Sequence, residues 1–459
     1  MLSLLKKKPL LFILLSAFAI RIIYFLAIII RNPAGIYVYD SNGYWNIAYN
    51  LRQYGVFSQS ANIPLEPDYY RTPIYPIFIF LSEVLGPEGF SIIFFQIILS
   101  VLTCYFTYRI AKEITHSNFI SCIAAIIVAI DIPSIVMSNL VLTETLFTFL
   151  LITCIYSFIR YLKTERMQTL IIASILCGAT ILCRPIGFFL PLFLSFFIIY
   201  HFRKKITTGL FKTGILFSLV LLSISPWLIR NKITFNHYFL SVIREHDMQN
   251  YQAAAIYAEL NNRSLAESQS ILRWKTFKEF KGDAHKQPYE YAKHIESEAM
   301  KIVFQHPGML IKHQAVQFVH FFLKPCRSYL DLQLGNWGKG FNMIPKNVSI
   351  VDYLFKHTSK LTITLVIFQL GILLILYISL IFGMFYFNKN KQILYLLLIG
   401  LLIFCFANLT LPEVTESRFR VPVVPYIAIL SASGIYFLKE KFRKRLELRA
   451  QKTTETRRT

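Results

Sequence analysis

Apolar runs recur along the chain and constrain its fold more than any other feature. Most are roughly 17–25 residues long, enough to cross a hydrocarbon core about 30 Å thick. Because 55% of the residues are hydrophobic and the mean hydropathy is +0.50, the composition is that of an integral membrane protein. The sequence therefore predicts an all-α polytopic bundle of about ten transmembrane helices. The predicted spans are 9–30, 90–111, 118–137, 141–162, 168–183, 185–201, 209–229, 361–387, 392–411 and 421–438.

Lysine and arginine collect at alternate ends of these runs. The groups are Lys6–Lys8, Arg109 with Lys112, Arg160–Arg166, Arg203–Lys205, Lys389 with Lys391, and the tail from Lys439 to Arg458. The positive-inside rule places that side in the cytoplasm, and an even number of spans then places both termini there. The net charge of +23 is thus mainly a topology signal, with the tail expected to contact membrane lipid. Nucleic-acid binding is disfavoured because the charge is interleaved with spans.

Two long segments then lie on the extracytoplasmic side of the membrane, which we expect to be the cell (inner) membrane. We expect an N-terminal transmembrane module over 1–229 that includes the extracytoplasmic loop 31–89 with its juxtamembrane helix region. A mainly helical extracytoplasmic domain over 230–360, transmembrane helices over 361–438 and a basic cytoplasmic tail over 439–459 follow. Ser264 to Glu267 forms a capping box that opens one helix of the domain, and Pro288 and Pro307 open two more.

The same domain lacks the sequence features of nucleotide binding. It contains no strand pattern long enough for a nucleotide-binding sheet, and no glycine-rich phosphate loop precedes a helix. An activated substrate is therefore expected to arrive within the lipid. His306, His313 and His320 recur every seven residues, about 10.5 Å along a helix, too far apart to share one metal ion. A disulfide between Cys183 and Cys326 is disfavoured, because nothing in the sequence brings them together.

Ionisable residues gather at the predicted outer ends of separate spans. They are Asp40, Arg71, Glu144, Arg184, Arg230, Glu416, Arg418 and Arg420. An ionisable group near lipid costs about 2.5–3.5 kcal/mol on insertion scales, so such groups normally face a partner or a water-filled cavity. The pattern predicts a charged cavity that opens outward and suits an anionic, membrane-tethered substrate.

The two carboxylates at this face each allow two interpretations. Asp40 can accept a proton from an incoming hydroxyl or amine, or hold a divalent cation; alternatively, it caps a helix over 43–53. Glu144 opens a span, where a carboxylate also interacts favourably with the helix dipole.

The outer arginines run against the positive-inside trend, so topology does not account for them. Arg184 stands between two apolar runs and is followed by Pro185, and Arg230 follows Trp227, which is expected at headgroup level. Guanidinium groups bind phosphate oxygens in a bidentate manner. The alternative is ion pairing with Asp40, Glu144 or Glu416.

Four sequence pieces, in this order and on one side of the membrane, resemble the polytopic GT-C glycosyltransferases. The similarity is to the branch of protein mannosyltransferases, aminoarabinose transferases and lipopolysaccharide-core-type glycosyltransferases. The pieces are the first-loop signature from Asp40 through Tyr44 and Gly55 to Arg71-Thr72-Pro73 and Tyr75-Pro76; Glu144 before an apolar run; Leu182-Cys183-Arg184-Pro185 with Pro226-Trp227 and Arg230-Asn231; and Arg418-Phe419-Arg420 with Pro422.

The resemblance implies an inverting sugar transfer from a polyprenyl-phosphate-linked donor to an envelope glycolipid, glycan or protein. Asp40 would be the general base or a metal ligand, and Glu144 a second catalytic carboxylate. The residues implied to bind the donor phosphate are Arg71, Arg184, Arg230, Arg418 and Arg420, with Arg420 the strongest single choice. The other implied cavity residues are Tyr44, Tyr75, Asp131, Trp227 and Glu416.

This chain departs from the family pattern at two positions. Some members carry a paired acidic motif in the first loop, whereas Asp40 is followed by Ser41. A divalent metal cofactor therefore stays open, with Asp40 as its ligand if one binds. Asp131 stands where relatives often have an uncharged residue, and it is expected to add to the cavity.

Two other function classes share the expected architecture. A polysaccharide polymerase or ligase acting on lipid-linked glycans would have the same spans, outer loops and arginines, and the product distinguishes it. A flippase for lipid-linked glycans would need charges at mid-membrane and along both sides of its pathway, and Arg21 is the main mid-span charge. The flippase is therefore disfavoured.

Overall fold

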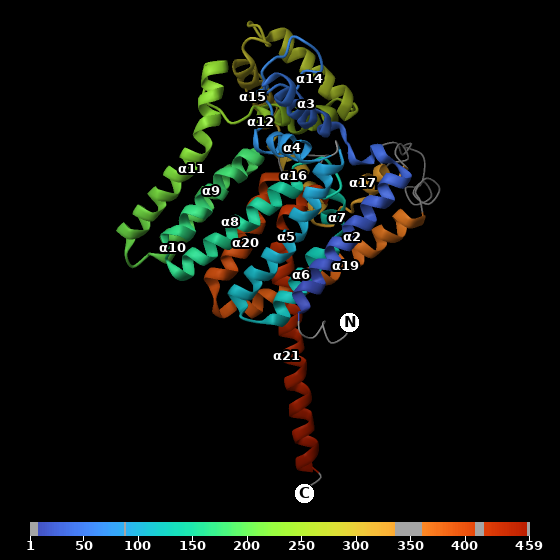
Figure 1. The fold of residues 1–459 in the computed structure, drawn as a ribbon, viewed down its shortest axis with the longest axis vertical. Coiled ribbons are helices and arrows are strands. Elements are labelled where there is room, and N and C mark those ends of the chain that lie inside the picture. Colours follow the sequence, from blue (N-terminus) through green and yellow to red (C-terminus); the bar gives the residue numbers. More distant parts are fainter. Residues whose placement is uncertain (1–7, 87–88, 336–359, 409–416, 457–459) are drawn as a thin grey trace.

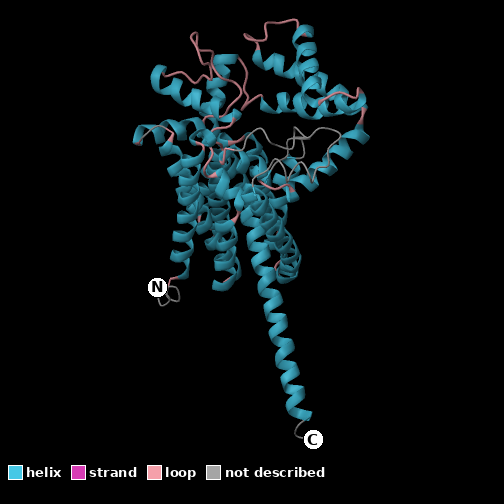
Figure 2. Cartoon of the chain, turned by 90° about the vertical axis from the view of Figure 1, so that its right-hand side faces the viewer, coloured by secondary structure: helices cyan, strands magenta, loops and turns pink. Residues whose placement is uncertain are grey.

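The chain folds into a bundle of long helices with a layer of shorter helices over one end (Figure 1). This computed structural model describes residues 8–86, 89–335, 360–408 and 417–456 of the 459-residue chain. Every regular element in these ranges is helical, as the composition predicts (Figure 2). The start of α2 and the end of α21 lie at the end of the bundle opposite the helical layer.

Each predicted apolar run contains a helix of the bundle. These helices are α2 (Pro9–Arg31), α5 (Phe90–Thr115), α6 (Asn118–Ile130), α8 (Glu144–Thr164), α9 (Met167–Cys183), α10 (Leu190–His201), α11 (Ile206–Phe235), α19 (Lys360–Tyr386), α20 (Lys391–Asn408) and α21 (Val424–Thr456). Among the described residues, six helices are long and apolar enough to cross a membrane: α2, α5, α8, α11, α19 and the continuous helix made by η6 and α21. The others are shorter, so the multi-pass architecture is confirmed but the number of ten spans is not.

The outer layer is built from short helices of the first loop, of the connection between α6 and α8, and of the segment after α11. They are η1 (Pro33–Ile36), α3 (Tyr39–Tyr54), α4 (Ile74–Leu85), α7 (Ile132–Met137), α12 (Ile243–Asp247), the π-helix η3 (Met248–Ala253), α13 (Ala254–Leu260), α14 (Leu265–Glu279), α15 (Pro288–Gln305), α16 (Pro307–Leu323) and α17 (Arg327–Gln333). The predicted capping box is present, because Ser264 Oγ accepts a hydrogen bond from the backbone N–H of Glu267 at 3.2 Å. Three further 3-10 helices complete the described part of the chain: η2 (Pro185–Phe189), η5 (Phe387–Lys389) and η6 (Ser417–Val423).

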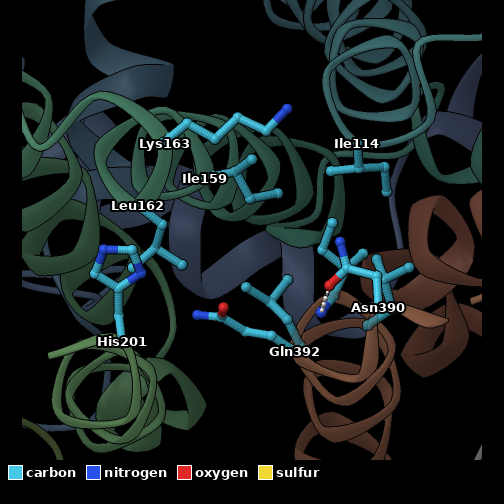
Figure 3. A pocket seen from close by; sticks show the side chains of 10 residues that line it. Ile114, Ile159, Leu162, Lys163, His201, Asn390 and Gln392 are labelled. Carbon is cyan, nitrogen blue, oxygen red and sulfur yellow. Dashed lines mark hydrogen bonds between the residues drawn. The ribbon is translucent and has the colours of Figure 1, made fainter. Parts of the chain in front are cut away.

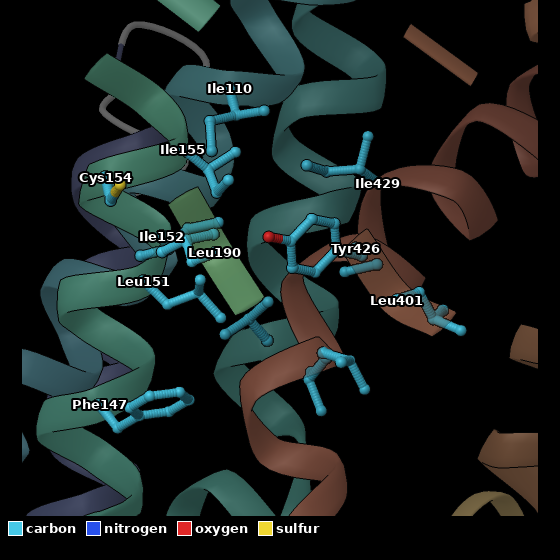
Figure 4. Close-up of a cluster of buried hydrophobic side chains, with 14 of the residues drawn as sticks. Ile110, Phe147, Leu151, Ile152, Cys154, Ile155, Leu190, Leu401, Tyr426 and Ile429 are labelled. Atoms are coloured by element: carbon cyan, nitrogen blue, oxygen red, sulfur yellow. The ribbon is translucent and has the colours of Figure 1, made fainter. Parts of the chain in front are cut away.

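Helix α8 is the centre of the apolar core. Its residues Phe147, Leu151 and Ile155 are buried and face Leu190 of α10 and Tyr426 of α21 (Figure 4). Between helices in lipid, tight packing and interhelical hydrogen bonds supply much of the association energy. The core therefore fixes the outer end of α8, where Glu144 is the first residue, relative to α21.

Glycines allow α19 and α21 to approach closely. A Cβ atom on Gly434 would overlap the carbonyl oxygen of Ser379, and one on Gly383 would overlap that of Leu430. Ser431 Oγ also donates to the carbonyl oxygen of Leu376 at 2.8 Å across this contact. Small residues at such interfaces let helix backbones pack directly. The contact anchors α21 and hence the preceding turn η6, which carries Arg418.

Arg21 joins three helices in the interior of the bundle. Its side chain is fully buried and donates to Ser100 Oγ of α5 at 2.8 Å and to the carbonyl oxygen of Ala129 in α6 at 3.0 Å. A further contact reaches the carbonyl oxygen of Val128 at 3.4 Å. These carbonyls belong to the last turn of α6, where they have no partner within the helix and the dipole favours a cation.

We predict that Arg21→Leu lowers the free energy of unfolding by about 1–3 kcal/mol, because it leaves buried carbonyl and hydroxyl groups without their donors. Thermal unfolding of the purified protein in detergent measures the change. Arg31→Gln, at an exposed position of the same helix, is the matched control and should melt like the wild type. An Arg21→Leu protein as stable as this control would show that Arg21 does not hold the three helices together.

Candidate active site

A polar cavity of about 130 Å³ opens between the outer end of the bundle and the helical layer. It brings together side chains from five separate regions of the sequence: the first loop, the start of α8, the end of α9, the segment formed by α12 and η3, and the turn η6. Six residues singled out in the sequence line it: Asp40, Tyr44, Arg71, Glu144, Arg184 and Arg418. The fold thus gathers charged residues of all four motifs around one space.

Asp40 is held by two arginines. It lies in the first turn of α3, and its carboxylate accepts from Arg71 Nη2 and Arg418 Nη1, each at 3.1 Å. Burial alone would raise its pKa, but the guanidinium groups of Arg418 and Arg71 outweigh burial and lower the pKa to about 2. The helix-cap interpretation does not apply, because Val38 is the N-cap and its N–H donates to Ser41 Oγ at 2.9 Å.

Arg71 is oriented on all sides by the first loop. Its guanidinium lies 4.4 Å from the centre of the Tyr44 ring and donates to the Tyr44 hydroxyl at 2.9 Å. Its backbone N–H donates to Asp68 Oδ1 at 2.7 Å. Asp68 is 2% exposed, and burial raises its pKa to about 6 despite this hydrogen bond. These contacts fix the side chain of Arg71 at the mouth of the cavity.

Glu144 is the second anionic centre. It is 2% exposed at the start of α8, and its Oε1 accepts from Arg184 Nη1 at 2.9 Å, with Arg418 Nε at 3.9 Å. Arg184 follows α9 in an extended conformation, because Pro185 disfavours helical geometry before it. A buried carboxylate costs free energy unless it is paired, and the two arginines provide that pairing.

Three guanidinium groups therefore converge on two carboxylates. Arg184 and Arg418 share one oxygen of Glu144, while Arg71 and Arg418 share the carboxylate of Asp40. The five side chains carry one more formal positive charge than negative. We refer to this set, Asp40, Arg71, Glu144, Arg184 and Arg418, as the arginine cluster. Its excess charge and its bidentate donors suit an anion such as a phosphate group.

Two predicted phosphate-binding arginines lie elsewhere. Arg420 is fully buried and donates to the carbonyl oxygens of Phe321 at 2.9 Å and Phe322 at 2.8 Å, at the end of α16. Arg230 donates to the carbonyl oxygen of Asp68 at 2.6 Å. Neither lines the cavity. The expectation for Arg420 is therefore corrected, because the last turn of α16 uses its hydrogen-bonding capacity.

Other predicted cavity residues have structural contacts. Tyr75 is fully buried and donates to Gln96 Oε1 at 2.8 Å, and Trp227 Nε1 donates to the carbonyl oxygen of Leu240 at 2.8 Å. Asp131 caps α7 by accepting from the Ser134 N–H at 2.9 Å. Tyr75, Trp227 and Asp131 do not line the cavity. Glu416 lies outside the described residues.

The donor set around Asp40 does not suit a divalent cation. Both of its carboxylate oxygens accept from guanidinium groups, so two positive charges lie against them. Within the part of the chain that the structure describes, no group of three or more His, Cys, Asp or Glu side chains could hold a metal ion. The five side chains of the cluster are better suited to an anion.

The cavity also contains residues that the sequence did not single out. Tyr70 belongs to the first loop, next to Arg71, and Asp247 and Tyr251 come from α12 and η3 of the helical layer. Burial, followed by the charge of Asp40, raises the pKa of Asp247 to about 7. No motif marks these positions, since the segment after α11 has many charged residues and no recognisable signature. They reach the cavity only because the fold places the helical layer over it.

A second cavity, of about 160 Å³, lies among α5, α8, α10 and α20 (Figure 3). Ile159, Leu162 and other apolar side chains make up most of its lining. Its basic side chains already have acidic partners, because Lys163 lies 3.6 Å from Glu113 and His201 lies 3.1 Å from Glu165. It lacks the converging charges of the first cavity, which we take as the candidate active site.

Comparison with known proteins identifies the fold. Residues 70–229 match the family model of dolichyl-phosphate-mannose-protein mannosyltransferases. The whole chain superposes on the archaeal oligosaccharyltransferase AglB from Archaeoglobus fulgidus, in complex with an inhibitory peptide and a dolichol-phosphate, with a TM-score of 0.53 at 15% identity. The chain has the fold of the polytopic GT-C glycosyltransferases. This confirms the resemblance given by the sequence motifs.

The superpositions cover nearly all of this chain but a smaller share of each solved structure. The superposition covers 97% of this chain and 52% of the AglB chain, so the chain spans about half the length of the archaeal enzyme. The same enzyme tethered to an acceptor peptide gives a TM-score of 0.52 at 15% identity, over 96% and 50% of the two chains. ArnT from Cupriavidus metallidurans, bound to undecaprenyl phosphate, matches with a TM-score of 0.42 at 10% identity, over 92% and 77%. No curated protein matches the sequence.

Proposed function

We propose that this GT-C protein transfers a sugar from a polyprenyl-phosphate-linked donor to an acceptor at the extracytoplasmic face of the membrane. The observation that carries the proposal is the convergence of Arg71, Arg184 and Arg418 on Asp40 and Glu144. The lipid tail of such a donor stays in the bilayer while its phosphate enters a cavity at the end of the bundle. The family model over residues 70–229, whose description names a dolichyl-phosphate sugar, supports this class of donor.

The reaction needs stabilisation of a leaving phosphate. As the bond between the anomeric carbon and the phosphate oxygen breaks, negative charge grows on the phosphate. Arg184 and Arg418 lie together at Glu144 Oε1 and can share this charge in a site that the protein already orders. One preorganised donor of this kind typically contributes about 3–4 kcal/mol to the transition state. Attack by the acceptor from the opposite face inverts the anomeric configuration.

The contacts of Asp40 assign it to the orientation of this site. Its two oxygens hold Arg71 and Arg418 in place, and a carboxylate with a pKa of about 2 is a weak base. Replacing it by asparagine removes the charge that orients the two guanidinium groups. We therefore expect Asp40→Asn to abolish transfer while leaving expression largely intact.

The alternative function is that of a polysaccharide polymerase or ligase. A polymerase or ligase would transfer a whole glycan rather than one sugar, and the similarity in fold to an oligosaccharyltransferase favours keeping it as the alternative. The arginine cluster would bind the lipid phosphate in either case. The product distinguishes the two functions.

Mass spectrometry of envelope glycolipids, glycans and proteins from cells with and without the gene tests the proposal. We expect one envelope component to be lighter by the mass of a single sugar in cells that lack the gene. Wild-type protein should restore the mass and Asp40→Asn should not. The loss of a whole glycan would establish the alternative function. Identical envelopes in both strains would contradict glycosyl transfer altogether.

The fork geometry of the arginines gives a second test. Arg184→Lys and Arg418→Lys keep the positive charge but lose bidentate binding, so transfer should fall about tenfold or more without loss of thermal stability. Arg263→Lys, at an exposed position of the outer layer, is the matched control and should be fully active. Arg420→Lys should instead lower the melting temperature, because Arg420 supports the end of α16. Full activity of both cavity variants would remove these arginines from the phosphate site.

Sidedness is also part of the proposal. The basic ends of the helices predict cytoplasmic termini, and the arginine cluster lies at the opposite end of the bundle. An epitope inserted after Asn262, in an exposed turn of the outer layer, should be labelled in intact cells. An epitope after Thr459 should be labelled once the cells are permeabilised. The reverse pattern would place the cavity in the cytoplasm and overturn an extracytoplasmic donor site.

A further inference from the structure

Asp247 is a carboxylate of the cavity that the arginine cluster does not use. It is the last residue of α12 and lines the cavity together with Asp40 and Arg418. Among the described residues, no hydrogen bond or ion pair engages its carboxylate, in contrast to Asp40 and Glu144. A carboxylate that is largely buried yet free of such partners in a cavity is available to a substrate.

The backbone at Asp247 is unusual and well anchored. The π-helix η3 begins at Met248, immediately after Asp247, and Tyr251 within it lines the same cavity. Short π-helical segments are rare and occur frequently at functional sites. The segment is tied to the first loop, because Ser241 Oγ donates to the carbonyl oxygen of Tyr70 at 2.6 Å. Asp247 is thus held over the cavity by contacts that do not involve its own carboxylate.

The charged groups around Asp247 differ from those around Asp40. The first loop presents Asp40, Arg71 and Tyr70, and the bundle presents Arg184 and Arg418, each interacting with Asp247 through space. Tyr251 faces it from η3. On its own helix, Arg244 pairs with Glu296 of α15, and Glu245 pairs with Lys293 of α15. His246 contacts the Tyr70 ring. None of these groups forms a direct ion pair with Asp247.

On the basis of the proposed function, we propose that Asp247 is the catalytic base that takes the proton from the acceptor. The acceptor oxygen or nitrogen forms a bond to the anomeric carbon and gives its proton to an Asp247 carboxylate oxygen. The bond between the anomeric carbon and the phosphate oxygen breaks, and its electron pair leaves with the phosphate, which the arginines hold. Asp247 then releases the proton to water.

The electrostatics of the cavity agree with this division of roles. Burial and the charge of Asp40 raise the pKa of Asp247 to about 7, whereas two arginines lower the pKa of Asp40 to about 2. A base is most effective when its pKa lies near the working pH. Two carboxylates whose environments separate their pKa values are commonly assigned different chemical roles. Asp247 can therefore gain and lose a proton near neutral pH while Asp40 stays ionised.

The test uses membranes from cells that express full-length variants, because such membranes carry the native donor and acceptor. The rate of appearance of the sugar-bearing product is followed by mass spectrometry between pH 5.5 and 8.5. In the wild type, the rate should rise with pH with a midpoint near 7. Asp247→Asn should lower the rate by about 10²–10⁴-fold and remove this rise. Asp247→Glu should retain partial activity with a pH-dependent rise. Asp283→Asn, exposed in the outer layer, should behave like the wild type.

Protein stability provides a readout that needs no activity. The pKa of Asp247 is raised from its ordinary value of 3.8 to about 7, so its contribution to stability is fully present below pH 3.8 and is lost as the pH rises from there through about 7. Asp247→Asn should therefore melt at a higher temperature than the wild type at pH 8, with a smaller difference at pH 5. This result would also show that the variant folds.

Each outcome bears on the inference. A loss of less than tenfold in Asp247→Asn, or a rise with pH that persists in this variant, would overturn the role of Asp247 and leave the proposed function intact. Wild-type membranes that form no sugar-bearing product would overturn the proposed function itself, and the base role with it. A stable, inactive Asn variant together with a partly active Glu variant supports the base.

Discussion

The pairing of buried charges at the outer end of the bundle is the constraint on which the rest of the site depends. Glu144 is almost fully buried, and Asp40 lies between two guanidinium groups. Removing such groups from water costs several kcal/mol each, so none of them would be stable there alone. The cluster exists because α3, the segment between α3 and α4, α8, the end of α9 and η6 each deliver one of its members to the same place.

Arginine serves two separate purposes in this fold. Arg71, Arg184 and Arg418 face the cavity, whereas Arg21 and Arg420 donate to backbone carbonyls at the ends of α6 and α16. The role of Arg21 and Arg420 is structural. The end of a helix has carbonyl groups without a partner in the helix, and a buried guanidinium group donates hydrogen bonds to them. The close contact between α19 and α21 and the hydrogen bonds of Arg420 together hold η6, so Arg420 positions Arg418, which lies two residues away and faces the cavity.

Much of the fold could be predicted because apolar runs and basic ends are strong, local signals. The ten runs each contain a helix, and Ser264, Pro288 and Pro307 mark helix starts in the outer layer. The number of spans could not be predicted in the same way. Asp131 and Pro133 divide one run into α6 and α7, so that the helix before the break is too short to count as a span.

The site was predictable in part for a related reason. Sequence motifs and sidedness selected Asp40, Glu144, Arg71, Arg184 and Arg418, which do meet. They could not separate Arg418 from Arg420, because whether an arginine faces a cavity or a helix end depends on the packing of α16, far away in the sequence. Asp247 was missed because its role arises from tertiary placement: α12 carries it over a cavity formed by other segments.

Location of the donor phosphate is the measurement that tests the account most directly. An electron cryomicroscopy structure of the full-length protein with a polyprenyl phosphate would show where this group binds. The account predicts that the phosphate lies between the guanidinium groups of Arg184 and Arg418, with hydrogen bonds to both, and that the lipid tail runs along the bundle. A phosphate bound away from these side chains, with the arginine cluster closed on itself, would contradict it.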